Sequence, residues 1–448
     1  MKTPIADFVS EYARTGGTRL HMPGHKDVSL LGCESLDITE IKGADDLFSP
    51  EGIVAESERN ATALFGTGQT LYSTEGATLP IKAMLALAVQ NAPKTGGRPR
   101  VLAARNAHKS FVYGCGLLDI DVTWLFPQKA AHLCSCPVSA DEVDVALSAA
   151  DSPFCAVFLT SPDYLGQIQD IAGISAVCKR HGVPLLVDNA HGAYLAFSEP
   201  VCHPIALGAT MCADSAHKTL PVLTGGAYLH IAKDAPGCFF EGAREAMALF
   251  ASTSPSYLIL QSLDLCNAYL ADRFPTELSA CAKEVAACKA ALAQSGFTLW
   301  GEEALKITLS AEKKGYTGTE IAKTLRDAGI EPEFADNDLA VLMYTPQNTA
   351  ADRARLLSAL SALEDRTPLA KSDTVMPSIP EKIYSIRTAL LSPAETVDLQ
   401  NAIGRICATP SVSCPPAVPI VMSGERVTKQ HVLLCQRYGI DALRVIKE

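Results

Sequence analysis

The sequence predicts an α/β protein whose large domain is built on a mainly parallel seven-stranded sheet, with a smaller α+β domain toward the C-terminus. Two observations support this fold class. Between residues 56 and 235, short apolar runs alternate with longer amphipathic stretches, the pattern of parallel strands joined by covering helices. Residues 297–370 then alternate shorter strands and helices, as expected of a second and smaller domain.

Seven apolar runs are the candidate strands of the large domain. They are Thr70–Thr74, Arg100–Ala104, Asp121–Phe126, Cys155–Thr160, Pro184–Asp188, Thr210–Asp214 and Gly226–Ile231. Ile81–Gln90 and Ile171–His181 are amphipathic and are expected to be helices. Further on, a helical Ala/Leu-rich pattern runs over 257–292, and Ala304–Leu309 and Leu339–Met343 are candidate strands of the second domain. Ligands of such sheets gather beyond the carboxyl ends of the strands.

Composition divides the chain into three parts. Residues 1–55 are rich in Gly, Pro and acidic residues with little periodicity, and we expect them to form an N-terminal arm. Residues 56–290 are expected to form the large domain and residues 291–448 the small C-terminal domain, with a linker at about 371–381. The 448 residues, 48% of them hydrophobic, are enough to fill more than one core.

Charge and cysteine usage narrow the function class. The net charge is −11 with a pI near 5.4 and the sequence has no basic run, so no nucleic-acid or membrane partner is expected. No stretch is apolar for long enough to span a bilayer and the first 17 residues do not read as a signal peptide, so we expect a cytoplasmic protein. The 15 cysteines are odd in number and scattered without a C-x-x-C pair, which indicates buried thiols and no metal site.

The strongest local motif is Asp214-Ser-Ala-His-Lys218, between an apolar strand and a Gly-containing one. A lysine at a strand end among small and hydroxyl residues can lose its proton, which a lysine that binds pyridoxal 5'-phosphate (PLP) as a Schiff base must do. Ser215 and His217 can supply donors to the cofactor phosphate. The alternative for such a string is an ordinary surface loop.

A second motif ends the strand 30 residues earlier, at Asp188 and His191. Burying an aspartate is costly unless it meets a cation or donors, and a protonated pyridine nitrogen is such a cation. That pairing keeps the cofactor ring an effective electron sink. The structural alternatives are a helix N-cap for Asp188 and a capping or metal-binding role for His191.

Two further motifs follow strands. Gly76, Ala77 and Thr78 precede a helix, where small residues expose backbone N–H groups and the helix dipole favours a phosphate; the alternative is a simple N-cap by a threonine. His108 can lie flat on an aromatic ring, whereas Lys109 is a rival Schiff-base lysine that lacks a phosphate-binding group before it. Phosphate loop, stacking histidine, acid and lysine at successive strand ends are what a PLP site of the aspartate-aminotransferase-like fold (PLP fold type I) requires.

These residues resemble the Orn/Lys/Arg decarboxylase family, whose members are fold-type-I PLP-dependent decarboxylases. The resemblance is strong over residues 1–260, and its most specific element is the H-x-P-G-H-K start. The matching segments are HMPGHK at 21–26, ADDL at 44–47, GAT at 76–78, NAHKS at 106–110, VD at 187–188, AHG at 190–192 and SAHK at 215–218, with STSPSY at 252–257 and the stretch from Pro415-Pro416 to Gly424-Glu425 further on.

The resemblance implies decarboxylation of arginine, lysine or ornithine to a polyamine-pathway amine. Lys218 would carry the cofactor, Asp188 pair with its ring nitrogen, His108 stack on its ring, His191 orient the acid or the ring, and Gly76, Ala77, Thr78, Ser215 and His217 hold its phosphate. The resemblance also implies a homodimer or larger homo-oligomer with active sites at the interface. Residues 252–256, His25 and Lys26 would then reach the partner's site.

The substrate is less well specified than the cofactor. A dicationic product calls for acids, and Asp45, Asp46, Glu75 and Asp163 are candidates, with solvated surface acids as the alternative for each. Three departures from the family pattern bear on substrate identity: Asn189 stands where an acid is usual, Asp163 where a small residue is usual, and the C-terminal segment reads CPPAV at 414–418. The short chain argues for a compact biosynthetic-type member.

Other functions use the same cofactor site. An aminotransferase would need an arginine for the substrate carboxylate, and Arg387 and Arg405 are available late in the chain. An amino-acid lyase differs only in the bond that breaks at Cα. A catalytically silent binding or assembly protein is the third alternative, disfavoured by the presence of both Lys218 and Asp188.

Overall fold

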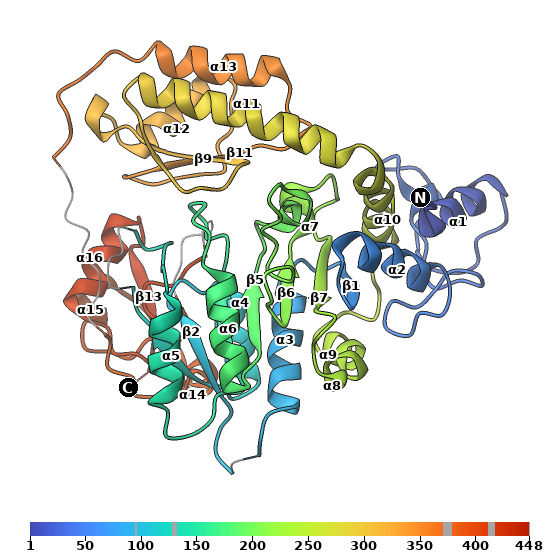
Figure 1. Cartoon of the computed structure of the whole chain (residues 1–448), viewed down its shortest axis with the longest axis horizontal. Helices are drawn as coiled ribbons and strands as arrows, with labels where there is room; N and C mark the ends of the chain where they lie inside the picture. The colour runs from blue at the N-terminus through green and yellow to red at the C-terminus, as the bar shows by residue number, and fades with distance from the viewer. Residues whose placement is uncertain (95, 128–131, 371–378, 411–416, 448) are drawn as a thin grey trace. The chain divides into compact units, whose positions relative to one another are not determined.

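The computed structural model describes residues 1–94, 96–127, 132–370, 379–410 and 417–447 (Figure 1). They form two compact units, Met1–Pro93 with Ser175–Glu277 (unit 1) and Lys94–Ile174 with Leu278–Glu448 (unit 2). Most of the expected linker, residues 371–378, and the Pro415-Pro416 pair lie outside the described residues. Within these ranges, no helix combines the length and the apolar character that crossing a membrane requires.

The seven predicted strands are confirmed, each with ends within one residue of the expectation. They form one sheet in the order β1-β7-β6-β5-β4-β2-β3. The strands are β1 (Gln69–Ser73), β2 (Arg100–Ala104), β3 (Asp121–Leu125), β4 (Ala156–Thr160), β5 (Leu185–Asp188), β6 (Met211–Asp214) and β7 (Ala227–Ile231). β7 is antiparallel to β1 and β6, whereas β5–β6, β2–β3 and β2–β4 are parallel pairs. The mainly parallel α/β fold class is therefore correct.

Helices connect and flank the strands of unit 1. They are α2 (Ile53–Phe65), α3 (Thr78–Gln90), η2 (Ala193–Phe197), α7 (Ala216–Thr219), α8 (Gly237–Glu241), α9 (Ala243–Ala248) and α10 (Tyr257–Asp272). α3 packs on β6 and β7 and is covered by α9 (Figure 1). Its residues from Leu79 to Ala88 are apolar almost throughout and mostly buried, as expected of a helix enclosed on several sides.

Residues 1–55, expected to form an arm with little periodicity, contain an unpredicted helix, α1 (Pro4–Arg14), followed by η1 (Glu34–Leu36). α1 is amphipathic and packs on α2 and α10. The N–H groups of Ile5 and Ala6 donate to Asp264 Oδ2, at 2.9 and 3.0 Å. The acid that caps this helix is about 260 residues away in α10, so the cap leaves no local signal, whereas Pro4 at the first helical position is a local signal of the start.

The helical pattern expected over 257–292 is divided into α10 and α11 (Phe274–Gln294). Pro275 lies in the first turn of α11, where a missing N–H costs nothing because no intrahelical acceptor is available there. The proline therefore starts a second helix where the periodicity alone suggested one continuous element.

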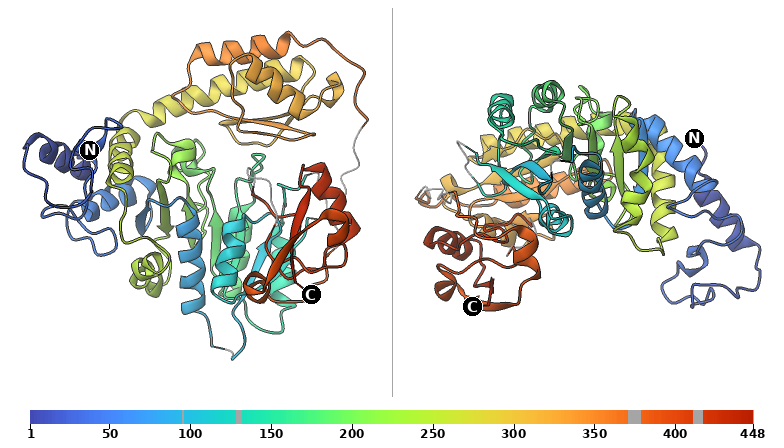
Figure 2. Two further views of the ribbon diagram at one scale, coloured as in Figure 1. Left: turned by 180° about the vertical axis from the view of Figure 1, so that it is seen from behind. Right: turned by 90° about the horizontal axis from the view of Figure 1, so that it is seen from below.

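Unit 2 contains a second, antiparallel sheet of four strands in the order β10-β11-β9-β8. The strands are β8 (Thr298–Trp300), β9 (Lys306–Ser310), β10 (Phe334–Ala335) and β11 (Ala340–Met343), which confirms the two strands expected here. α11, α12 (Gly318–Asp327) and α13 (Ala350–Ser361) lie over one face of this sheet, as both side views show (Figure 1 and Figure 2, left).

The rest of unit 2 contains strands β2, β3 and β4 of the large sheet and a C-terminal segment, which is residues 379–410 and 417–447. Its helices are α4 (Lys109–Leu117), α5 (Ala140–Ser148), α6 (Ile171–His181, which continues into unit 1), α14 (Ile386–Leu391), α15 (Leu399–Ala402) and α16 (Lys429–Arg437), with η3 (Glu312–Lys314). β12 (Ala394–Asp398) and β13 (Ala442–Ile446) pair antiparallel, and α14 packs on α4. Leu399, Val421, Val432, Cys435 and Leu443 form the core of the C-terminal segment.

Candidate active site

Lys218 and His191 lie side by side in unit 1. Lys218 is in α7, which begins directly after β6, and His191 is in the loop after β5. Since β5 and β6 are parallel neighbours, their carboxyl ends meet at one edge of the sheet. Lys218 Nζ is 3.0 Å from His191 Nε2. Two of the predicted site residues are therefore in hydrogen-bonding contact.

Asp188 is the last residue of β5 and is only 3% exposed. Its Oδ1 accepts a hydrogen bond from the N–H of Ala190, at 3.2 Å. Burial raises the pKa of Asp188 to about 6, although the charge of Lys218 acts to lower it. A buried carboxylate with a raised pKa gains strongly from a cationic partner.

The predicted phosphate loop contacts the segment that follows Lys218. Gly76 has a positive φ of 66° and donates its N–H to Gly225 O at 2.7 Å. A Cβ on Gly225, where φ is 101°, would lie 2.8 Å from the carbonyl oxygen of Thr74. Gly225 therefore permits the close approach, and Gly76 permits the left-handed backbone conformation. Ala77 and Thr78 lie where α3 begins, so the unpaired first N–H groups of that helix belong to this loop.

Ser215 and His217 flank the start of α7. Ser215 is its N-cap residue, and His217 Nδ1 is 3.1 Å from Gly226 O. Because a carbonyl oxygen can only accept, Nδ1 carries the hydrogen and the neutral ring leaves Nε2 unprotonated. Burial lowers the pKa of His217, and the nearby charge of Lys218 lowers it further. A bound dianion would favour protonation of Nε2, which would then become a donor.

His108 and Lys109 belong to unit 2. His108 is the N-cap residue of α4, and its Nδ1 accepts the N–H of Ser110 at 3.2 Å and lies 2.7 Å from Ser110 Oγ. Lys109 is the first residue of α4, and its N–H donates to Ala417 O at 3.1 Å. The imidazole is therefore oriented by the start of its own helix.

The four acids considered for the substrate all accept hydrogen bonds from backbone N–H groups. Asp45 accepts from residues 51, 52 and 54 at the start of α2, Asp46 from 48 and 49, Glu75 from Ser252, and Asp163 from 165 and 167. Asp163 is fully buried and Asp45 is 9% exposed, so neither of these two is a solvated surface acid. A substrate role for the four acids stays a prediction.

The arm residues named as possible contributors are held within the arm. His25 Nε2 is 3.3 Å from Asp37 Oδ2, and His25 Nδ1 accepts the N–H of Asp27 at 3.2 Å. Lys26 has a positive φ of 51°, and its ammonium contacts His21 O. These contacts fix the backbone of the H-x-P-G-H-K segment.

The two arginines considered for an aminotransferase have structural partners. Arg387 donates to Leu117 O at 2.9 Å and to Gly116 O at 3.4 Å, at the end of α4. Arg405 donates to Glu395 Oε1 and to Ile446 O, both at 2.8 Å. The sequence expectation that they are available for a substrate carboxylate gains no support from these contacts.

A buried polar cluster that the sequence motifs do not predict lies beside the candidate site. Asp214, the last residue of β6, accepts from Asn189 Nδ2 at 2.7 Å and lies 3.0 Å from His203 Nε2 and 3.3 Å from His230 Nε2. Cys212 Sγ is 3.7 Å from Asp214 Oδ1, and His203, Cys212 and Asp214 are close enough to hold one metal ion. Cys212 and Asp214 are two residues apart on one strand, but nothing in the sequence shows that His203 and His230 lie beside them.

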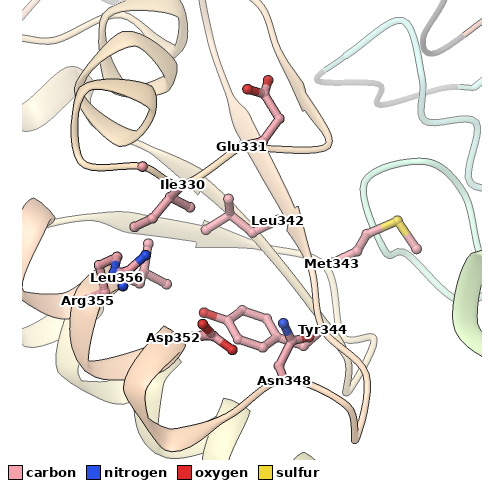
Figure 3. Close-up of a pocket in the computed structure, with 10 residues that line it drawn as sticks. Ile330, Glu331, Leu342, Met343, Tyr344, Asn348, Asp352, Arg355 and Leu356 are labelled. Carbon is pink, nitrogen blue, oxygen red and sulfur yellow. The ribbon is translucent and has the colours of Figure 1, made fainter.

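A pocket of about 210 Å³ lies in unit 2, and its lining includes none of the residues predicted for the site (Figure 3). Tyr344 and Asn348, from the connection between β11 and α13, and Asp352, from the first turn of α13, lie on one side, and Ile330 and Leu342 lie on another. The Asp352 carboxylate caps α13 by accepting from Thr349, so it already has a structural partner.

Comparison with known proteins identifies the family. The sequence pattern described as Orn/Lys/Arg decarboxylase, major domain, matches residues 3–306, and the pattern described as its C-terminal domain matches residues 377–439. The chain belongs to the Orn/Lys/Arg decarboxylase family. Membership makes it an enzyme of the amino-acid decarboxylase class, and the resemblance seen in the motifs is correct.

Curated relatives of this decarboxylase family cover nearly the whole chain. The uncharacterised protein YaaO of Bacillus subtilis is 29% identical over 469 residues, covering 96% of this chain and 93% of YaaO. An arginine decarboxylase of Bacillus subtilis is 26% identical, covering 96% of this chain and 92% of its own length. An arginine decarboxylase of Halalkalibacterium halodurans is 27% identical and covers 100% and 98%.

Solved structures confirm the fold class. The lysine decarboxylase LdcF of Francisella novicida is similar with a TM-score of 0.81 at 17% identity, over 99% of this chain and 81% of that one. The constitutive lysine decarboxylase of E. coli has a TM-score of 0.79 at 19% identity, over 100% and 82%. A structure of SPT with PLP has a TM-score of 0.55 at 17% identity, over 69% and 75%. The aspartate-aminotransferase-like fold of PLP-dependent enzymes is therefore confirmed.

The residues of unit 1 fit the chemical groups of PLP. The cofactor offers an aldehyde to an amine, a pyridine nitrogen to an acid and a phosphate to N–H donors. Lys218 supplies the amine, and Asp188 is a buried acid whose raised pKa calls for a cation. The start of α3 and the Ser215–His217 segment supply the donors.

Proposed function

We propose that this chain catalyses the PLP-dependent decarboxylation of a basic amino acid, arginine, lysine or ornithine, to the corresponding amine. The observation that carries the proposal is the 3.0 Å contact between Lys218 Nζ and His191 Nε2 at the edge of the sheet where the strand bearing buried Asp188 ends. Family membership and curated relatives named arginine decarboxylase support the reaction class.

Asp188 holds the charge state of the cofactor ring. When bound, PLP acts as an electron sink that stabilises negative charge developing at Cα of the amino acid. The Asp188 carboxylate is costly to ionise in its buried position, and a protonated ring nitrogen beside it would offset that cost. The attraction between the two charges would in turn stabilise the protonated nitrogen. Asp188 would therefore keep that nitrogen protonated while the carboxylate of the substrate is lost.

Lys218 and His191 would handle protons. An imidazole nitrogen 3.0 Å from a lysine amine can accept its proton, and a neutral amine is the form of Lys218 that reacts with an aldehyde. The same pair can return a proton to Cα of the product. His108, placed at the start of α4, would stack on the ring.

The phosphate would be held by Gly76, Ala77, Thr78, Ser215 and His217. The first N–H groups of the 13-residue α3 have no intrahelical acceptor, so an anion is favoured there. The contact of Gly76 N–H with Gly225 O holds the loop of α3 close to the segment that bears Lys218.

We also propose a homodimer or larger homo-oligomer with active sites at the subunit interface. The arm exposes several large apolar side chains, with Leu20 91%, Leu30 82% and Leu31 88% exposed. Large apolar side chains gathered on one exposed segment are typical of a surface that another subunit covers. His25, Lys26 and residues 252–256 would then contribute to the partner's site.

Release of carbon dioxide from arginine, lysine and ornithine tests the reaction. With PLP added, the wild-type protein should release carbon dioxide from at least one of the three, and Lys218→Ala should release none above background. Amine exchange that depends on a keto acid, without carbon dioxide, would instead support an aminotransferase and would overturn the proposal.

A further inference from the structure

We infer that the C-terminal segment holds the His108 loop in place, with Glu425 as a positioning residue that acts on cofactor binding through Arg105 and His108. The inference rests on the proposed function, because it takes His108 to be the residue that stacks on the ring. All contacts that carry it lie within unit 2. They hold the stretch from Arg105 to the end of α4 at three places, which are the Arg105 side chain, the N–H of Lys109 and the last carbonyls of α4.

The first contact is a buried ion pair between Arg105 and Glu425. Arg105, the residue after β2, donates from NH1 to Glu425 Oε1 at 2.6 Å and from NH2 to Oε2 at 2.7 Å. The two side chains are only 8% and 6% exposed, and the guanidinium also lies over the rings of Trp124 and Phe126. A bidentate charged pair in this setting has one favoured geometry, and loss of one partner leaves an uncompensated charge.

Glu425 is itself fixed in the C-terminal segment. Its Oε2 also accepts the N–H of Met422 at 2.8 Å, and its own N–H donates to the Met422 carbonyl at 3.2 Å. The backbone of Glu425 also pairs with that of Cys407, whose N–H donates to Glu425 O at 2.9 Å. The pair with Arg105 therefore joins β2 to a rigid turn of the C-terminal segment.

The second contact is on the backbone next to His108. The N–H of Lys109, the first of α4, donates to Ala417 O at 3.1 Å. The first N–H groups of a helix have no acceptor within it, so Ala417 supplies one from outside. Ala417 has a positive φ of 58°, a conformation that costs free energy in a residue other than glycine. This carbonyl fixes the peptide group that follows His108.

The third contact is at the far end of α4. Arg387 in α14 donates to the carbonyls of Gly116 and Leu117, which are unpaired at a helix end. A Cβ on Gly116 would be 2.5 Å from Leu390 Cδ1, so α14 packs there without any intervening side chain. The C-terminal segment thus holds both ends of the helix that His108 begins.

Glu425→Gln tests the inference, with Glu381→Gln as its matched control. Glu381 is an exposed acid in the same segment and pairs with Arg426 at 2.8 Å. Spectroscopic titration of the cofactor-free full chain with PLP should give a dissociation constant about tenfold higher for Glu425→Gln, a coupling of the size seen between residues in contact. Glu381→Gln should leave the constant unchanged.

A double-mutant cycle separates positioning from general destabilisation. If Glu425 acts through His108, Glu425→Gln should weaken PLP binding about tenfold in the wild-type background and less than about twofold in His108→Ala. Equal weakening in both backgrounds, or none in either, would overturn the inference. If Glu425→Gln does not fold, Arg387→Gln at the other end of α4 enters the same cycle with the same two outcomes.

Amide hydrogen exchange of the cofactor-free protein supplies a second readout. Glu425→Gln should speed exchange in peptides covering residues 105–110 more than in peptides from β5 and β6, and uniform exchange would contradict the inference. Failure of the inference about Glu425 is distinguishable from failure of the proposed function. If the wild-type protein binds no PLP, the proposed function fails, whereas normal PLP binding by Glu425→Gln sinks only the positioning role.

Discussion

Two aspartates end neighbouring strands of unit 1, and their surroundings differ. Asp188 ends β5 and Asp214 ends β6, and both are buried. Burial raises the pKa of Asp188 to about 6. Burial acts on Asp214 in the same direction, but His203 and His230 outweigh it and hold the pKa of Asp214 well below its usual range.

The difference separates structure from function. Asp214 has donors from Asn189 and His203 and the imidazole of His230 nearby, so its charge is compensated inside the fold. Asp188 accepts the N–H of Ala190 and meets the charge of Lys218. Ionised Asp188 is therefore costly to the protein alone and becomes favourable beside a ligand cation. In the proposed function, Asp188 would pair with the ring nitrogen of PLP, whereas the contacts of Asp214 give it a stabilising role.

The largest expected effect is on catalysis at Asp188. Asp188→Asn should lower kcat for carbon dioxide release by about 10²- to 10³-fold, the usual cost of losing one preorganised electrostatic group. The reason is that an amide cannot keep the ring nitrogen protonated. Steady-state kinetics at saturating PLP measures this, and a loss of less than about threefold would remove Asp188 from the site.

The next effect is on folding at Asp214. Asp214→Asn should lower the free energy of unfolding of the cofactor-free protein by about 3–5 kcal/mol, because it breaks a buried charge network. Denaturant unfolding measures the change. Asp234→Asn is the control, since it breaks an exposed pair with Lys179 and should cost less than about 1 kcal/mol. Equal losses for the two variants would refute a special role for the cluster.

Asp188→Asn should have the opposite effect on stability. Folding raises the pKa of Asp188 from near 3.8 to about 6, so the wild-type protein loses stability as the pH rises through this window and not below it. At pH 7.5 the variant without PLP should therefore be more stable than the wild type by up to about 3 kcal/mol, since each pKa unit is worth about 1.4 kcal/mol. Denaturant unfolding at pH 4 and pH 7.5 should show the difference only at pH 7.5. A variant less stable at both values would contradict the account.

The smallest effect is at the edge of the Asp214 cluster. Thr70 Oγ1 is 2.8 Å from His230 Nδ1, so Thr70→Val should cost about 1 kcal/mol, the net value of one hydrogen bond. The same unfolding experiment measures it. A cost matching that of Asp214→Asn would mean that the hydroxyl, and not the carboxylate, organises the cluster.

Features set by local sequence could be predicted from it. Each strand of the large sheet is an apolar run bounded by polar or small residues, so the sequence predicts all seven. Asp188 ends one such run, and His191 and Lys218 follow such runs. The contact of α1 with Asp264 spans 259 residues and the Arg105–Glu425 pair spans 320, so neither contact leaves a local trace. The charge of the acids proposed for the substrate does not reveal their partners, which are backbone N–H groups.

The most direct test of the central claim is the identity of the lysine that binds PLP. The protein is incubated with PLP, reduced with borohydride, digested and examined by mass spectrometry. The account predicts a phosphopyridoxyl group on the peptide that contains Lys218, and its disappearance in Lys218→Ala. A modification found mainly on Lys109, or spread over surface lysines without preference, would contradict the assignment of the site.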